Sequence, residues 1–263
     1  MGVYPDYPDN RLVVDGIDLT ETFGMVMADG YTLDLPKPKT YTIDLLGGDG
    51  VIDLTEAITG DVTYDNRSQK FTFYVINLED HETFEDLKTA VFNYLHGKDF
   101  DYTLSFDPGY TYHGRFTVSS ASHTMYSSGI LGAIQIDIDA EPYKSSGMVT
   151  YKLKGGTKRV EIDVINGRKR VIPIIEVKTA ATIAYNGQQW NVEAGTHIID
   201  DLLLESGKST IYINTSPKFG DRTVAYWSKY SISSLMSKRI IDLFGDNTDT
   251  GGDAYVRFER FDL

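Results

Sequence analysis

The chain has 263 residues, of which 41% are hydrophobic and 24% charged, a composition typical of a globular protein rather than a disordered or fibrous one. It contains no cysteine, which excludes disulfides, thiolate metal sites and cysteine catalysis and suits assembly in a reducing cytosol. The net charge of −13 argues against binding to a nucleic-acid backbone as the main activity. No apolar run approaches the roughly 18 residues of a membrane-spanning helix.

The charge is divided unevenly along the chain. Residues 1–143 carry 8 basic and 24 acidic side chains, a net of −16, whereas residues 144–263 carry 17 and 14, a net of +3. The change coincides with Pro142 and the stretch Ser145-Ser146-Gly147, a composition typical of a connection between domains. We therefore expect two domains, residues 1–143 and residues 144–263.

The first domain shows short runs that alternate between apolar and polar residues. Leu12–Val14 and Ile17–Leu19 flank Asp15-Gly16, a dipeptide that favours a two-residue hairpin turn. The alternation predicts further strands at Tyr31–Leu35, Tyr41–Leu45, Lys70–Leu78, Asp101–Phe106, Tyr110–Val118 and Ile134–Ile138. Lys70–Leu78 is apolar on both faces, so we expect it to be buried on both sides.

One segment departs from this alternation. Beyond Asp80, the expected N-cap, apolar residues recur at spacings of three and four, and Gly97 follows as a stop signal. The recurring residues are Phe84, Leu87, Val91, Tyr94 and Leu95. They predict an amphipathic helix from about residue 81 to 96 that packs on a sheet.

The second domain is again rich in strand patterns. Strands are expected at Val160–Val164, Val171–Val177, Ile183–Tyr185, Gln188–Val192 and Ala254–Phe261, with a short helix at Ser234–Phe244. Asn166-Gly167 and Asn186-Gly187 each predict a hairpin turn between neighbouring strands. Regular strands with short turns are typical of a β-sandwich. The chain as a whole is therefore predicted to be mainly β.

No arrangement typical of catalysis or metal binding is present in the sequence. The five histidines lack metal-ligand spacing, and no Gly-x-Ser-x-Gly motif occurs. Residues 246–253 have the residue types of calcium ligands without the spacing of an EF-hand loop. We therefore expect no enzymatic activity, no catalytic residues, no metal and no cofactor.

Two tryptophans and a basic cluster leave alternatives open. Trp190 and Trp227 could stack on sugars, which makes a carbohydrate-binding, lectin-like adhesion protein the alternative function; a core position is the commoner role of tryptophan. The basic cluster comprises Lys152, Lys154, Lys158, Arg159, Arg168, Lys169 and Arg170. Because it lacks interleaved aromatic residues for base stacking, we interpret it as a surface that faces the acidic domain of a neighbouring subunit.

A resemblance to a known family rests on these segments: Gly47–Ala57, Gly60–Arg67, the strand Phe71–Phe73, Glu141–Lys144 and Ile172–Val177. In this order they resemble the distal tail (Dit) family, the tail-tip hub proteins of siphophages and prophages of Gram-positive bacteria. Glu141–Lys144 is similar to that family's junction between domains, and Ile172–Val177 to the entry into its C-terminal domain. The block Gly48–Arg67 is the most specific part.

The resemblance implies two β-sandwich-like domains, an N-terminal one with the helix and a projecting hairpin and a galectin-like C-terminal one. It implies a structural virion protein at the tail tip, assembled in the bacterial cytoplasm as a homo-hexameric ring. The ring would join the major tail tube protein to the tail-associated or baseplate hub protein, hold receptor-binding proteins in some phages, and let DNA pass. Neither sequence-specific nucleic-acid binding nor membrane insertion is implied.

Five residues of the most specific block are candidates for a subunit contact or a structural loop: Gly48, Asp49, Gly50, Asp53 and Arg67. The glycines permit backbone angles that allow a sharp turn or the close approach of another chain. Arg67 is one of few basic residues in an acidic domain, so we expect it to pair with Asp49 or Asp53. That pair would lie either within the chain or across a subunit interface, where a guanidinium can bind a carboxylate with two parallel hydrogen bonds.

Overall fold

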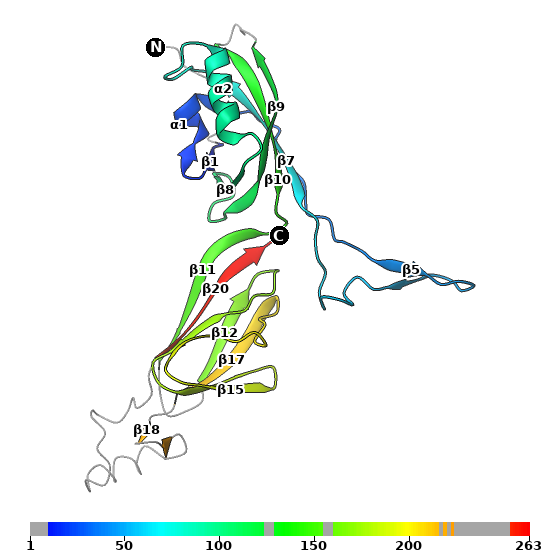
Figure 1. Ribbon diagram of the computed structural model, residues 1–263, viewed down its shortest axis with the longest axis vertical. Helices are drawn as coiled ribbons and strands as arrows, with labels where there is room; N and C mark the ends of the chain where they lie inside the picture. Colours follow the sequence, from blue (N-terminus) through cyan, green and yellow to red (C-terminus); the bar gives the residue numbers. More distant parts are fainter. Residues whose placement is uncertain (1–9, 124–128, 155–159, 216–217, 220–221, 224–252) are drawn as a thin grey trace. The chain divides into compact units, whose positions relative to one another are not determined.

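The computed structural model describes residues 10–123, 129–154, 160–215, 218–219, 222–223 and 253–263 (Figure 1). These residues form two compact units that divide between Ser145 and Ser146. Both units are built from antiparallel strands, so the predicted mainly β fold is confirmed. Three features of the sequence lie outside the described residues: the helix expected at Ser234–Phe244, Trp227, and residues 246–252 of the calcium-like loop.

The first unit is built on one eight-stranded antiparallel sheet in the order β2-β1-β8-β9-β10-β7-β3, with β4 also paired to β7. Its strands are β1 (Leu12–Val14), β2 (Ile17–Asp18), β3 (Met25–Met27), β4 (Thr32–Leu33), β7 (Arg67–Val75), β8 (Asp99–Leu104), β9 (Tyr112–His123) and β10 (Gly132–Ala140). A separate two-stranded sheet contains β5 (Thr42–Asp44) and β6 (Val51–Asp53). The strands expected in this unit are all present, with shifted ends.

The eight-stranded sheet is strongly curved. Strands β8 and β7 are separated by two other strands, which on a flat sheet would place them about 14 Å apart. Nevertheless, the Tyr102 hydroxyl of β8 donates a hydrogen bond of 2.8 Å to Gln69 Oε1 of β7. The pairing of β10 with β9 also shifts register between Gln135 and Ile136, an irregularity that lets a strand bend. The concave face therefore encloses a core.

Two helices complete the first unit. Helix α2 (Phe84–Leu95) confirms the predicted amphipathic helix, and its buried residues are Phe84, Leu87, Val91 and Leu95. It begins later than expected because Thr83, rather than Asp80, is the N-cap: Thr83 Oγ1 accepts a hydrogen bond of 3.2 Å from the Asp86 amide. None of the helices in the described part of the chain is long and apolar enough to cross a membrane.

The predicted hairpin at the start of the chain is confirmed in part. Val14 pairs with Ile17, and Asp15 and Gly16 have the positive φ angles of 49° and 79° that this turn requires. The second strand is shorter than expected, because Asp18 caps helix α1 (Leu19–Phe23) by accepting a hydrogen bond from the Thr20 amide.

The second unit is a sandwich of two four-stranded antiparallel sheets, β11-β20-β13-β16 and β12-β17-β14-β15. Its strands are β11 (Lys144–Leu153), β12 (Val160–Asn166), β13 (Ile174–Val177), β14 (Ala181–Tyr185), β15 (Gln188–Val192), β16 (Gly195–Ile198), β17 (Gly207–Thr215) and β20 (Ala254–Asp262). Side chains from both sheets form a single buried core. A further pair, β18 (Lys218–Phe219) and β19 (Arg222–Thr223), forms its own small sheet.

Only one of the two Asn-Gly dipeptides forms a hairpin turn. Asn186 and Gly187 have positive φ angles and connect the paired strands β14 and β15. The hairpin expected at Asn166-Gly167 is wrong, since β12 pairs with the distant β17. Asn166 is buried and donates through Nδ2 to the Lys169 and Glu205 carbonyl oxygens, at 2.8 and 3.2 Å. Its side chain therefore links the loop after β12 to the segment before β17, instead of forming a tight turn.

Candidate functional site

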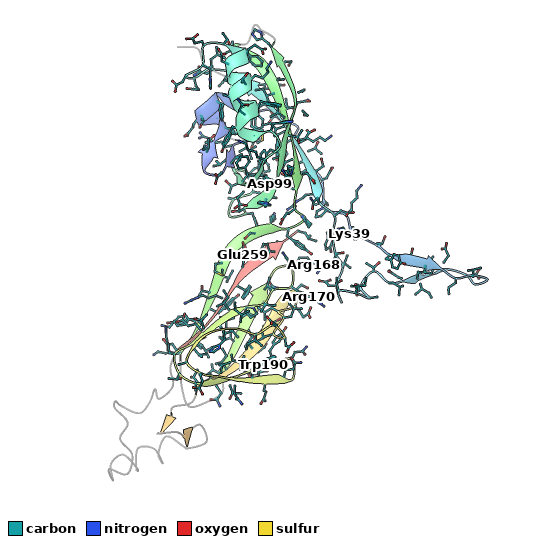
Figure 2. The ribbon with its side chains drawn as sticks, viewed as in Figure 1. Lys39, Asp99, Arg168, Arg170, Trp190 and Glu259 are labelled. Atoms are coloured by element: carbon teal, nitrogen blue, oxygen red, sulfur yellow. The ribbon has the colours of Figure 1, made fainter. Side chains whose placement is uncertain are left out.

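Residues 37–66 form an arm that leaves the first unit between β4 and β7. Its root is closed by two backbone hydrogen bonds of 2.8 Å, from the Lys39 amide to the Thr63 carbonyl and from the Asp65 amide to the Lys37 carbonyl. Beyond the root, β5 and β6 pair only with each other, and the ribbon reaches away from the eight-stranded sheet (Figure 1). Figure 2 labels Lys39 at the root, where its ammonium pairs with Asp65 at 3.5 Å.

The arm is amphipathic, although it covers no core of its own. Ile43 of β5 is paired with Ile52 of β6, and alternation places further apolar residues on the same side. This apolar face of the arm consists of Tyr41, Ile43, Leu45, Ile52 and Leu54. Tyr41 is 60% exposed and Ile43 and Ile52 are 44% and 45% exposed. A two-stranded sheet is only marginally stable alone, so we expect another surface to pack against this face and stabilise it.

Further apolar side chains lie at the tip of the arm and in the turn that follows β6. Leu46 is fully exposed and Ile58 is 96% exposed. So many exposed large apolar side chains on one segment are unusual on a monomeric protein and point to an interaction site.

Three of the five candidate residues, Gly48, Asp49 and Gly50, occupy the tip of the arm between β5 and β6. Gly50 has a positive φ of 86°, and the Gly48 amide donates to the Leu45 carbonyl, closing the turn between β5 and β6. Asp49 lies exposed within this turn. The expected sharp turn is therefore present, while a role of these residues in a subunit contact stays a prediction.

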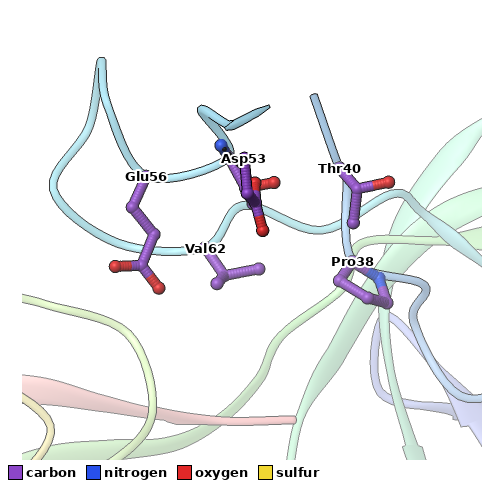
Figure 3. A pocket seen from close by; sticks show the side chains of 6 residues that line it. Pro38, Thr40, Asp53, Glu56 and Val62 are labelled. Carbon is purple, nitrogen blue, oxygen red and sulfur yellow. Dashed lines mark hydrogen bonds between the residues drawn. The ribbon is translucent and has the colours of Figure 1, made fainter. Parts of the chain in front are cut away.

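The opposite side of the arm is hollowed near its root (Figure 3). The hollow has a volume of about 420 Å³ and is lined by Pro38, Thr40, Asp53, Thr55, Glu56 and Val62. Asp53 Oδ1 accepts a hydrogen bond of 2.9 Å from the Thr55 amide, and the hydrogen bonds to Thr55 lower the pKa of the Asp53 carboxyl. Asp53 is thus a charged, exposed residue of the arm.

Arg67 is paired with no carboxylate among the described residues, which corrects the expected intrachain pair with Asp49 or Asp53. It lies on the buried face of β7 and is only 6% exposed. Its Nε donates to the Glu141 carbonyl oxygen at 3.3 Å, and its guanidinium lies 4.9 Å from the centre of the Tyr112 ring. The two-residue repeat of the strand could have predicted this burial. Arg67 is four residues before Phe71, so both side chains lie on the same, core-facing side of β7.

Arg67 belongs to a buried polar cluster at the root of the arm. The rings of Tyr102 and Tyr112 stack with their centres 5.4 Å apart. Burial lowers the pKa of the Arg67 guanidinium, an effect that Tyr112, Tyr102 and Asp107 partly oppose. Burial likewise raises the pKa of both tyrosines. The cluster therefore holds a cation against neutral aromatic rings.

The ion pair between Asp107 and Lys144 lies next to this cluster and is joined to it by Tyr112. Lys144 Nζ lies 2.7 Å from Asp107 Oδ2, and the Tyr112 hydroxyl donates to the same carboxylate. Burial raises the pKa of Asp107, but the hydrogen bonds from Lys144 and Tyr112 outweigh burial and hold the pKa below its usual value of 3.8. Lys144 Nζ also lies 4.0 Å from the centre of the Tyr110 ring.

This pair predicts a stability that depends on acid pH. Because the folded-state pKa of Asp107 is below the unfolded-state pKa, its contribution is present above about pH 4 and is lost as the pH falls through the folded-state value. We expect Asp107→Asn to lower the free energy of unfolding by about 1–3 kcal/mol at pH 7, the cost of losing hydrogen bonds to a charged group. The difference from the wild type should shrink at pH 3.

Denaturant unfolding of both proteins at pH 7 and pH 3 measures this difference. The control Asp49→Asn, at an exposed position of the arm, should change the free energy of unfolding at pH 7 by less than about 0.5 kcal/mol. An Asp107→Asn effect of the same size at both pH values would contradict the assignment.

The second unit contains Trp190 and the basic cluster, the two other candidates from the sequence. Trp190 (Figure 2) is half-buried, pairs with Ile183 across β14 and β15, and packs against the sandwich core, as the structural interpretation expects. Of the basic cluster, Lys152 pairs with Asp253, and Arg170 with Glu205. Lys158 and Arg159 lie outside the described residues. Among the described residues, no group of three or more His, Cys, Asp or Glu side chains is arranged to hold a metal.

Comparison with known proteins identifies the fold. No family model and no curated protein sequence matches the chain. Among solved structures, it is similar to the Dit protein of phage SPP1, with a TM-score of 0.58 and 14% identity over 97% of this chain and 99% of that chain. Two structures of the phage p2 baseplate in its activated conformation, with Ca and with Sr, give TM-scores of 0.38 and 0.35 at 8% and 11% identity, covering 95% of this chain and 98% of theirs.

The SPP1 protein is described as a paradigm of the hub of the adsorption apparatus in phages that infect Gram-positive bacteria. The likeness extends over both units and nearly the whole of both chains. The resemblance found in the sequence is thereby confirmed at the level of the fold. The chain has the fold of a phage distal tail (Dit) protein.

Proposed function

We propose that this protein is a structural hub at the distal end of a phage tail, where six copies close into a ring. The amphipathic arm is the observation that carries this proposal. Its apolar face has no partner within the described part of the first unit, and a second copy of the chain is the occupant we infer for it. The likeness to the SPP1 hub protein supports the same assignment.

A second copy fits the arm for a physical reason. Each isoleucine or leucine that moves from water into an interface contributes about 1.5–3 kcal/mol, and the apolar face offers several of them. Among the described residues, no further strand pairs with the outer edges of β5 and β6, so these edges can receive a strand of another copy. A ring repeats one such contact around a closed circle, so an arm that leaves one copy is received by the next.

The remaining parts of the proposal are taken from the distal tail family that the sequence resembles. The first unit would form the ring, and the second unit would be the galectin-like domain of each copy. The ring would join the tail tube protein to a baseplate hub protein and, in some tails, hold a receptor-binding protein, with assembly in the bacterial cytoplasm. The net charge of −16 in residues 1–143 would keep DNA from adhering to the channel during passage.

Size-exclusion chromatography with light scattering tests the proposal directly. We expect the purified chain to give the mass of six copies, or that mass plus the mass of its tail partners when they are added. We expect negative-stain images to show rings. A monomer at all concentrations and with all tail partners would contradict the hub. If that monomer were also retained on a glycan resin, the carbohydrate-binding alternative would replace it.

A further inference from the structure

The buried cluster at the root of the arm contains two hydrogen-bond donors without partners. Arg67 is 6% exposed and Gln69 is 1% exposed, and they occupy alternate positions on the buried face of β7. Among the described residues, neither Arg67 Nη2 nor Gln69 Nε2 has a hydrogen-bond partner. Buried polar groups in native proteins are almost always paired, so each orphan needs an explanation.

Both donors lie against the same pair of stacked tyrosines. The Arg67 guanidinium lies over the Tyr112 ring, and Gln69 Oε1 accepts a hydrogen bond from the Tyr102 hydroxyl. Since those rings stack on each other, the two orphan donors belong to one local environment. The four side chains are at most 6% exposed.

The charges of this environment do not balance. It holds two cations, Arg67 and Lys144, and one carboxylate, Asp107. That carboxylate already accepts hydrogen bonds from Lys144 and Tyr112. The hydrogen bond from Arg67 Nε goes to a neutral backbone carbonyl. A buried guanidinium without a bonded carboxylate is costly, and it is stabilised by a second negative charge.

We propose that a small monovalent anion of the halide class binds between Arg67 Nη2 and Gln69 Nε2. Both open positions are N–H donors, so the occupant must accept twice, and a halide does so without protons of its own that need acceptors. The near-complete burial of both side chains favours a small ion over a carboxylate carried on another protein molecule. The anion would bridge two side chains at the start of β7, directly after the point where the arm ends.

Thermal unfolding of the full chain at constant ionic strength tests the site. We expect sodium chloride to raise the melting temperature of the first unit by about 2–4 °C relative to sodium gluconate, whose anion is too large to enter. Gln69→Glu places a carboxylate beside Arg67, so this variant should no longer distinguish the two salts. Lys70→Gln, on the exposed side of the same strand, should respond to chloride as the wild type does.

Crystals of the wild type soaked in bromide give an independent measurement, even if Gln69→Glu does not fold. An anomalous peak within hydrogen-bond distance of Arg67 Nη2 and Gln69 Nε2 supports the site. A peak there without any chloride-dependent stability means an adventitious ion only and overturns the proposal. Absence of the peak overturns it as well, and so does a chloride response that persists in Gln69→Glu. None of these readouts depends on the ring.

Discussion

Replacing Leu87 by alanine is expected to lower the free energy of unfolding of the first unit by about 2–5 kcal/mol, the range measured for buried leucines. Leu87 is fully buried on the inner side of α2, where it packs against the core enclosed by the curved sheet. Truncation removes apolar contacts and leaves a cavity that the surrounding strands cannot fill, because each is held by hydrogen bonds to its neighbours. Denaturant unfolding monitored by far-UV circular dichroism measures the loss.

The same helix offers a matched control. Asn93 lies on the exposed side of α2, so Asn93→Ala should change the free energy of unfolding by less than about 0.5 kcal/mol. If Leu87→Ala cost as little as Asn93→Ala, the helix would not be packed on the sheet, and the core described above would be wrong.

The double variant Ile43→Ser/Ile52→Ser is expected to weaken assembly of the ring by at least about 10-fold while leaving the melting of the first unit unchanged. The two isoleucines form a cross-strand pair at the centre of the apolar face of the arm, and neither belongs to the buried core. Because both side chains are about half exposed in the free arm, the two together lose about 1.5–3 kcal/mol of burial, which corresponds to one or more factors of ten in association. Light scattering over a range of concentrations measures it.

The control for this experiment is Val51→Ser, an exposed apolar residue on the opposite face of the same two strands. It removes a similar β-forming side chain from the hairpin, so it reports whether loss of strand propensity alone weakens assembly. Assembly that survives in the double variant, or fails equally in Val51→Ser, would contradict a contact made by the apolar face.

Local patterns in the sequence were enough to predict most elements of the fold. The spacing of Phe84, Leu87, Val91 and Leu95 predicted α2, because one face of a helix repeats every three to four residues. Asp15-Gly16 and Asn186-Gly187 predicted their turns, since these residues adopt positive φ angles at low cost. Such signals act over a few residues, and they hold wherever the chain is later packed.

The candidate site was predicted only in part. The projecting hairpin and its glycine turn were expected from the resemblance of Gly48–Arg67 to the distal tail family, and the structure has both. The exposure of its apolar face could not be read from the alternation of Tyr41–Leu45. The same alternation describes a strand whose apolar side covers a core, and only the three-dimensional arrangement shows that the described part of the unit provides no such core.

The sequence by itself determined most of the secondary structure, the two-part division of charge and the sharp turn of the arm, but not helix α1 or strands such as β11 and β17. The tertiary structure alone decided which strands pair and what surrounds each polar group. Val160–Asn166 pairs with a strand more than 40 residues away, and Arg67 meets Tyr112 rather than an aspartate. The physical reason is that strand pairing and burial of a charge depend on contacts between distant segments, for which neighbouring residues carry no signal.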